Sequence, residues 1–488
     1  MIESVIFFFS GSGMVMLFIL FMRINVVGSK SKLVKHRSKE PGFVDLLIYA
    51  SVVDEGVIVG KDGSLMAAWA YQGVDSNSST EAERDQVSLQ INHALSRMGS
   101  GWMIHIDAVR KPAPGYSAKD DSHFPDPVSA AIDEERREFF ERVGTLYESN
   151  YVITATYLPP LLAQQKFVEL MFDDEGVPVD SKTRTIALLN HFKRECANIE
   201  SHLSSVFRMK RLKGKIITKE DNSSVNYDAF LRWIQFCISG LDHPVILPKN
   251  PIYLDALLSG QEFWGGVVPK IGQNFIQVVS IEGFPLASSP GLINSLADLP
   301  CLYRWSTRFI FMDTHEAVGH LEKFSKKWKQ KIRSFFDQVF NSHSSNVDQN
   351  AINMVSDAQA AIAETNSGEV AQGYYTSVVV LMSESRGDLE ASARQVAKAI
   401  NHLGFAARIE TINTIDAYLG SLPGHGVENV RRPLLNTMNL ADLMPSNTVW
   451  PGKNEAPCPM YPPMAPPLMH CTTQGATPFR LNLHVRDL

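Results

Sequence analysis

Apolar residues recur along this chain with the period of a helix in some stretches and of a strand in others. The clearest helical spacing is that of Val87, Ile91, Leu95 and Met98, whereas residues 102–109 alternate like a strand. The same patterns predict helices over 129–147, 183–211, 226–240, 314–340, 347–365 and 387–403, and strands over 151–158, 275–281, 302–312, 374–382 and 405–412. This mixture of elements predicts an α+β fold, or an open α/β layer.

Two stretches predict how neighbouring elements connect. Residues 57–71 contain two apolar runs around Lys61-Asp62-Gly63, which is a strong signal for a β-hairpin. The strand, helix and strand over 374–412 predict either a right-handed crossover unit or half of a ferredoxin-like fold. We find no internal repeat of fixed period in the sequence.

The last stretch of the chain is rich in proline. Residues 444–467 end in Tyr461-Pro-Pro-Met-Ala-Pro-Pro467. Because proline removes a backbone donor and fixes φ, we expect an extended connector there, in preference to a ligand for a proline-binding module. Residues 475–488 then predict a turn followed by a closing strand.

The N-terminus carries the only long apolar run. Residues 4–22 contain no charge, and as a helix they would span about 28 Å, close to the thickness of a bilayer core. The cations that follow are Arg23, Lys30, Lys32, Lys35, Arg37 and Lys39. A signal peptide would carry its positive charge before the apolar run. We therefore expect a single-pass bacterial inner-membrane anchor with the bulk of the chain in the cytoplasm.

Composition and charge narrow the class of protein. The 488 residues are 44% hydrophobic and 20% charged, as in a folded protein, and the net charge of −6 provides no general basic field for nucleic acid. The five cysteines form no Cys-x-x-Cys pair, which favours reduced thiols over a disulfide framework or a zinc site.

No stretch of the chain fits a phosphate-binding loop. The nearest is Gly56-Val-Ile-Val-Gly60-Lys61-Asp62, which has three residues between its glycines where four are needed. Asp62 also stands where a hydroxyl should meet magnesium, and its carboxylate would repel phosphate. The hairpin is the better interpretation, and we expect no Walker A motif in the chain.

Other candidate catalytic and metal sites are equally weak. His315 and His320 are five residues apart, whereas a zinc-protease helix needs four, so we expect the start of a helix at Thr314 instead. Ser64 and Ser421 lack the Gly-x-Ser-x-Gly elbow of a hydrolase. We therefore assign no catalytic, cofactor-binding or metal-binding residue.

Two basic stretches and one arginine pair leave alternatives open. The cations of residues 208–215 are explained by the C-terminus of a helix, which favours positive charge. Residues 323–333 predict a solvated amphipathic face, with a nucleic-acid or partner surface as the alternative. Arg431 and Arg432 could reach a nucleotide held elsewhere, or could form a loop ion pair.

Several stretches together resemble the TrbE-type conjugal-transfer ATPases of type IV secretion systems, the CagE/TrbE/VirB family. They are residues 54–65, 278–285 and 303–310, the segment from Leu419-Gly-Ser-Leu-Pro-Gly-His425 to Pro445, and the closing strand. The resemblance implies a cytoplasmic, membrane-associated ATPase that helps to assemble a conjugative channel and pilus. In that family the Walker A loop of a RecA-like motor follows the equivalent of His484, so we expect this chain to be the front portion without the motor.

The resemblance sets the predicted organisation. We expect a membrane anchor and basic segment over 1–40, an α+β domain over 41–160, a central helical and α/β domain with a long-helix insertion over 161–443, and a Pro-rich linker and strand over 444–488. ATP and magnesium are implied for the full-length family only, and we expect no ATPase activity from this chain alone.

The expected role follows from that organisation. We expect the chain to dock on inner-membrane components of the secretion channel and at the membrane, without binding nucleic acid directly; self-association is left open. The alternatives are a membrane-anchored hydrolase with an unrecognised site, and a truncated subunit that blocks the docking site of the channel.

Overall fold

A computed structural model gives the fold of the chain. It describes residues 42–73, 79–122, 124–159, 179–218, 224–248, 252–285, 287–339, 349–429, 431, 433–473 and 476–483. The chain divides into two compact units, 1–47 and 48–488. The described portion of the first unit holds one short helix, α2 (Phe43–Leu46), whose first turn is capped by Asp45. Everything below concerns the second unit.

The second unit is built on one large mixed sheet and two small ones. The strands are β1 (Tyr49–Asp54), β2 (Val57–Gly60), β3 (Leu65–Gln72), β4 (Trp102–Pro112), β5 (Tyr147–Tyr157), β6 (Arg208–Arg211), β7 (Gly214–Thr218), β8 (Ser224–Asp228), β9 (Ile246–Leu247), β10 (Phe263–Trp264), β11 (Lys270–Ile271), β12 (Asn274–Gly283), β13 (Tyr303–Phe311), β14 (Gln372–Ser383), β15 (Ala406–Ile409), β16 (Leu434–Asn436), β17 (Met469–Thr472) and β18 (Pro478–Leu481).

The helices lie between these strands in the chain. They are α3 (Glu81–Leu95), α4 (Pro127–Val143), α6 (Val179–Leu203), α7 (Ala229–Ser239), α8 (Leu254–Leu258), α9 (Thr314–Val339), α10 (Gln349–Ser367), α11 (Arg386–His402), α12 (Thr414–Leu419) and α13 (Thr437–Leu443), with short 3-10 helices at Lys119–Asp121 and Asn294–Asp298.

The large sheet contains the same topology twice. In its first half the strands lie in the order β6-β3-β5-β4, and in its second half in the order β15-β12-β14-β13, with antiparallel neighbours throughout. Each half therefore has the strand order 4-1-3-2 of a ferredoxin-like unit. Strands β4 and β13 join the two halves as antiparallel neighbours. Of the two alternatives for residues 374–412, the structure has the ferredoxin-like one, because β12 lies between β14 and β15.

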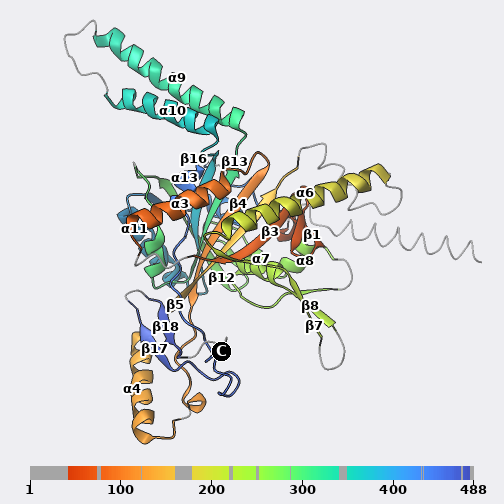
Figure 1. The fold of residues 1–488 in the computed structure, drawn as a ribbon, viewed down its shortest axis with the longest axis vertical. Helices are drawn as coiled ribbons and strands as arrows, with labels where there is room; N and C mark the ends of the chain where they lie inside the picture. The colour runs from red at the N-terminus through yellow and green to blue at the C-terminus, as the bar shows by residue number, and fades with distance from the viewer. Residues whose placement is uncertain are drawn as a thin grey trace, which may run out of the picture. The chain divides into compact units, whose positions relative to one another are not determined.

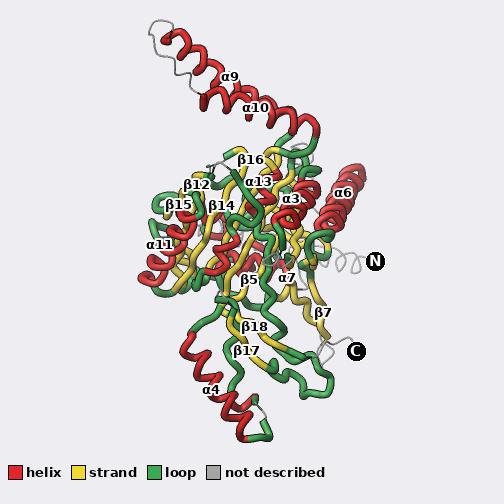
Figure 2. Tube along the Cα trace, turned by 60° about the vertical axis from the view of Figure 1, so that its left-hand side comes forward, coloured by secondary structure: helices red, strands yellow, loops and turns green. Residues whose placement is uncertain are grey.

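The hairpin of each half carries an insertion. Helix α4 lies between β4 and β5, and the long helices α9 and α10 lie between β13 and β14. Because β4 and β13 are antiparallel, the two insertions leave the sheet at opposite ends, as Figures 1 and 2 show. The long-helix insertion expected from the sequence is the α9–α10 pair.

The two faces of the sheet differ in chemistry. One face is apolar: Tyr303, Trp305 and Phe309 of β13 belong to a buried cluster that α3, α6, α11 and α13 cover. On β13 the residues between them are polar, and they face the opposite side of the sheet, where α7 and α12 lie. These polar residues are themselves buried, so the second face needs partners for every charge and hydrogen bond that it carries.

Most predicted elements are confirmed. The β2–β3 hairpin turns at Lys61-Asp62-Gly63, and α9 begins at Thr314 as expected. Residues 451–468 contain no helix or strand, which confirms the extended connector there, and the closing strand is present as β18, paired with β17. The predicted boundaries at 40, 160 and 443 stay predictions.

One long helix ends earlier than predicted. Helix α6 stops at Leu203, and residues 208–211 form β6, an antiparallel neighbour of β3. Arg211 lies over the ring of Trp69, 4.5 Å from its centroid. Pairing with β3 and this cation–π contact outweigh the helical propensity of Arg and Lys. The explanation of the basic stretch 208–215 as a helix end is therefore wrong.

The predicted fold class also needs a correction at the N-terminus. No helix among the described residues is long and apolar enough to span a membrane. The predicted transmembrane helix over 4–22 lies outside the described residues, so the structure does not support it. The fold is a mixed sheet with helices, and the predicted single-pass inner-membrane location is withdrawn together with the helix.

Candidate functional site

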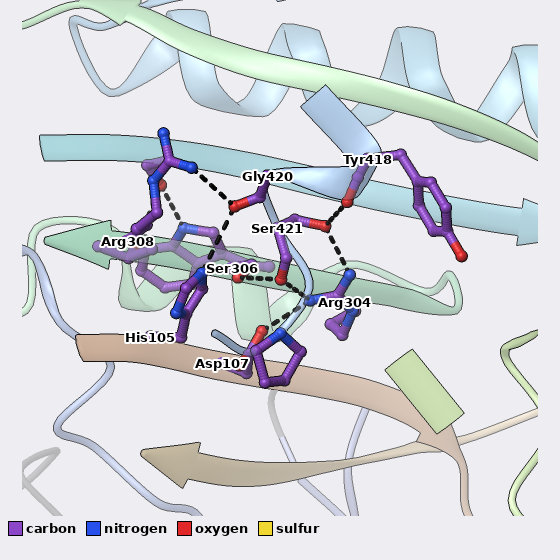
Figure 3. A network of polar contacts seen from close by, with 12 residues as sticks. His105, Asp107, Arg304, Ser306, Arg308, Tyr418, Gly420 and Ser421 are labelled. Atoms are coloured by element: carbon purple, nitrogen blue, oxygen red, sulfur yellow. Dashed lines mark hydrogen bonds and ion pairs between the residues drawn. The ribbon is translucent and has the colours of Figure 1, made fainter. Parts of the chain in front are cut away.

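A buried polar network lies where the two halves of the sheet meet. His105 and Asp107 come from β4, and Arg304, Ser306 and Arg308 come from β13. The strand register places Ser306 opposite Asp107 and Arg308 opposite His105, so these side chains share one face. Figure 3 shows them converging on the segment that follows α12. We call residues 419–429 the clamped loop.

An ion pair lies at the centre of the network. Arg304 Nη1 donates to Asp107 Oδ1 at 2.9 Å, and both side chains are almost fully buried. The same guanidinium donates to the backbone oxygen of Ser421 at 2.7 Å and to its hydroxyl oxygen at 2.6 Å. Arg304 therefore connects a strand carboxylate to the clamped loop.

A second arginine binds the loop without a carboxylate. Arg308 Nη1 donates to the backbone oxygens of His425 (3.1 Å) and Glu428 (2.8 Å), and Nη2 donates to that of Asn429 (3.1 Å). The oxygen of Gly420 is 3.4 Å from both Arg308 Nη1 and His105 Nε2. One buried cation thus collects carbonyl oxygens from both ends of the clamped loop.

Further contacts fix the path of the loop. Tyr49 on β1 donates its hydroxyl to the backbone oxygen of Pro423 at 2.8 Å, and Tyr418 donates to that of Ile238 on α7 at 2.6 Å. Gly424 has a φ of +87°, and a Cβ there would collide with the sulfur of Met66. Glycine is therefore required at this position by both backbone conformation and space.

Burial determines which groups of the network are charged. It lowers the pKa of His105 well below its ordinary value, and the charge of Arg308 lowers it further, so this imidazole is neutral at pH 7. Burial also raises the pKa of Asp107, although Arg304 and Ser306 act in the opposite direction. The pair with Arg304 is what keeps an ionised carboxylate tolerable at this depth.

The arrangement can hold a loop but has little room for a substrate. The cavity that Arg304 helps to line has a volume of about 20 Å³, which suits a single water molecule. No cluster of three metal-ligating side chains occurs in the part of the chain that the structure describes. We therefore interpret the network as a structural clamp that fixes the clamped loop across the junction of the two halves.

The sequence-derived candidates are scattered, with one exception. Ser421 belongs to the network, as an acceptor for Arg304 and a donor to the backbone oxygen of Tyr418. Ser64 donates to Asp62 in the hairpin turn, and Lys61 pairs with Asp255 at 2.6 Å. His320 lies 3.9 Å from Glu316 on the surface of α9. None of these arrangements is a nucleophile with a base.

The basic candidates are settled in part. Arg431 forms ion pairs with Glu410 and Glu282, which confirms the loop ion pair; Arg432 lies outside the described residues. In the stretch 323–333, Lys326 pairs with Glu322 on the exposed face of α9. The side chains from Trp328 onward lie outside the description, so the surface proposed for this stretch stays a prediction.

The Pro-rich connector is fastened to the sheet. Tyr71 and Tyr151 donate their hydroxyls to the backbone oxygens of Pro445 and Asn447, each at 2.8 Å. Farther along, Arg480 of β18 pairs with Glu148 of β5 at 2.5 Å and is itself buried. The connector is therefore extended but held in place, which prolines alone would not ensure.

A histidine beside β18 provides a pH-dependent prediction. His470 packs between the rings of Tyr116 and Phe140, and burial, aided by Arg480, lowers its pKa to about 4. The unfolded chain binds a proton near pH 6.5 that the folded chain refuses, so stability falls as the pH drops from about 6.5 toward 4.

We expect His470→Phe, which keeps an aromatic ring but cannot titrate, to remove about 2 kcal/mol of the stability loss between pH 6.5 and 4.5. Urea unfolding of both proteins at several pH values measures the difference. Parallel pH profiles of the two proteins would contradict the assignment.

The residues that carry the network were missed by the sequence reasoning. Arg304 and Arg308 stand two apart from Ser306 in a strand whose other positions are aromatic, and that alternation marks a polar face. An alternating strand normally turns such a face to water. Only the contact with residues more than 110 positions away shows that the face is buried.

Comparisons with known proteins identify the family. Residues 56–165 match the family described as "Type IV secretion system ATPase VirB4/TrbE, N-terminal domain", and residues 215–431 match the "CagE, TrbE, VirB family, component of type IV transporter system". The clamped loop lies entirely within the second match.

Three relatives give the same answer. The chain is 46% identical to "Conjugal transfer protein TrbE" of Rhizobium radiobacter over 455 residues, which are 93% of this chain and 55% of that protein. In Sinorhizobium fredii it matches two proteins, each named as a portion of a "Probable conjugal transfer protein TrbE". It is 46% identical to one of them over 61% of this chain and 45% of the relative, and 49% identical to the other over 26% of this chain and 84% of the relative.

The chain thus spans about half the length of the first two relatives and most of the third. The resemblance noted in the sequence is confirmed over nearly all of the 488 residues. The chain belongs to the TrbE family of conjugal-transfer ATPases of type IV secretion systems.

Proposed function

We propose that this chain is the N-terminal and central portion of a conjugal-transfer secretion ATPase, and that it docks on inner-membrane components of the secretion channel during channel and pilus assembly. The observation that carries the proposal is the 46% identity to a conjugal transfer protein over 455 residues. The clamp at the junction of the two halves supports it, because a docking platform must hold its surfaces in fixed positions.

The fastened connector supports the same role. Its backbone is held by Tyr71 and Tyr151, and β18 is held by the buried pair of Arg480 and Glu148. A segment fixed in this way can transmit force or movement between the sheet and whatever binds near β18. A loose linker could not, since it would absorb the movement.

Interference in a donor cell tests the docking role. The chain is expressed above the level of the resident protein in cells that carry a working conjugation system with a TrbE relative. We expect plasmid transfer to fall, because the chain would occupy docking sites on the channel. The clamp variant Arg308→Met should interfere less, and the exposed-surface variant Arg408→Met should interfere as much as the unchanged chain. Undiminished transfer at high expression would argue against docking.

We further propose that these 488 residues supply no nucleotide phosphate site of their own, since no stretch fits the Gly-x4-Gly-Lys-Ser/Thr pattern. Titration of the purified chain with ATP and magnesium in a calorimeter tests this. Saturable binding that a single substitution abolishes would contradict the proposal and would favour the hydrolase alternative.

A further inference from the structure

A cavity of about 630 Å³ opens on the polar face of the sheet, beside α7. Its floor consists of alternate residues from β4, β5, β3 and β6, which are neighbouring strands. The register pairs Lys111 with Glu148, Val109 with Asn150, and Gln72 with Arg208. These residues therefore share one face, which is the face that carries the clamp farther along β4.

The cavity has more cations than carboxylates. Its lining includes four cations (Lys111, Arg208, Lys210 and Arg232) and two carboxylates (Glu148 and Asp242). Asp242 pairs with Lys111 at 3.3 Å and with Arg232 at 2.5 Å, and Glu148 pairs with Arg480. Arg208 and Lys210 have no carboxylate partner among the described residues. In a chain of net charge −6, an uncompensated basic floor of this kind needs an explanation.

The neighbouring polar groups are able to bind an acceptor. Gln72 and Asn150 are exposed beside Arg208, and their amides donate hydrogen bonds. Trp233 lines the wall of the cavity; it is 9% exposed, and its indole N–H has no acceptor in the described part of the chain. Phe236 and Met209 provide apolar surface next to these donors.

The layout suits a ligand with several separated negative groups. The cations extend from β4 to β6, three strand spacings apart, which is about 14 Å. A single phosphate cannot meet them together. The N-terminus of α7, which could have bound a phosphate, is already capped by Asp228, whose carboxylate accepts from the amides of Phe230 and Leu231. Carboxylates along an extended peptide have the required spacing.

We propose that this cavity binds an acidic peptide segment of a partner protein. Asp or Glu carboxylates of the segment pair with Arg208 and Lys210, and an apolar side chain of the segment packs against Trp233 and Phe236. The charge complementarity of the floor and the mixed lining carry this choice. The inference goes beyond the proposed docking role and does not depend on it, because the binding can be measured with the purified chain alone.

Fluorescence anisotropy with a labelled synthetic peptide tests the proposal. The peptide alternates Glu with Leu, and a second peptide has Gln in place of each Glu. We expect the Glu peptide to bind the full chain saturably, the Gln peptide to bind far more weakly, and added salt to weaken the binding. Equal binding of the two peptides would overturn the proposal.

Paired variants locate the site. Arg208→Gln with Lys210→Gln should weaken binding of the Glu peptide roughly fivefold to tenfold, as expected for the loss of two partly exposed ion pairs. The matched control is Lys213→Gln with Lys215→Gln, which removes two cations from the same basic stretch but outside the cavity. Equal losses in both pairs would mean non-specific attraction and would overturn the site.

Competitors separate the acidic peptide from other anions. Unlabelled Glu peptide should displace the label, whereas pyrophosphate, ATP and vesicles containing phosphatidylglycerol should do so only weakly. Displacement by any of these at lower concentration than the peptide would overturn the choice of ligand. Because all four substituted residues are exposed, circular dichroism is sufficient to confirm that the variants fold.

Discussion

Replacing Arg308 by methionine should release the clamped loop from β13 and destabilise the protein by about 3 kcal/mol or more. The substitution keeps a long side chain but removes the charged donor from the buried carbonyl oxygens of His425, Glu428 and Asn429. A buried acceptor left without a donor costs about 1–3 kcal/mol, and water has little room to enter. Partial relaxation of the loop keeps the total below the sum.

Two measurements separate this effect from a general loss of stability. Urea unfolding gives the change in unfolding free energy, and hydrogen exchange followed by mass spectrometry reports the peptide that contains residues 419–429. Arg408→Met is the matched control, because Arg408 is 58% exposed and pairs with Glu282 only at 3.6 Å. We expect the control to change stability by less than about 0.5 kcal/mol. A similar small effect from Arg308→Met would show that the loop does not need the clamp.

Most strands could be predicted because their side chains obey a simple alternation. Residues 303–311 and 372–383 are rich in β-branched and aromatic residues, whose preference for strands agrees with their tertiary surroundings. Helix α11 likewise buries Leu389, Ala393, Val396 and Ile400, which are spaced three or four apart. Where local preference and burial point the same way, the sequence is sufficient.

The end of α6 shows where local preference fails. Val206 continues the helical spacing of Ile199 and Leu203, and the Arg and Lys residues that follow are good helix formers. The chain leaves the helix because β3 offers an unpaired edge at residues 69–72, and pairing with it satisfies the backbone of residues 208–211. No pattern within residues 183–211 contains that information.

The doubled topology and the clamp are beyond the sequence for a related reason. The two ferredoxin-like halves share strand order, but their loops differ: a 3-10 helix stands in the second half where α3 stands in the first, and α9 with α10 replaces α4. No fixed period survives such insertions. The clamp needs β4, β13 and the loop together, and its partners are separated by more than 110 residues.

The pair of Arg304 and Asp107 should respond to substitution in an asymmetric way. Arg304→Met leaves an unpaired carboxylate that is 0% exposed, and Asp107→Leu leaves an unpaired guanidinium that is almost as deep. Removing one partner of a buried ion pair costs about 3–5 kcal/mol, mainly because the other charge remains without compensation. Each single variant should therefore be strongly destabilised.

The double variant distinguishes an ion pair from simple packing. With both charges gone, the penalty for an uncompensated charge disappears, and the remaining loss is the two hydrogen bonds from Arg304 to Ser421, about 1–3 kcal/mol in total. We therefore expect the double variant to be more stable than either single variant, as urea unfolding would measure. If the two single effects simply add, the side chains contribute independently and Asp107 is not the counter-ion of Arg304. If the double variant recovers stability but residues 419–429 still exchange quickly, Arg304 acts through Ser421, and its contact with the loop is what the junction of the two halves requires.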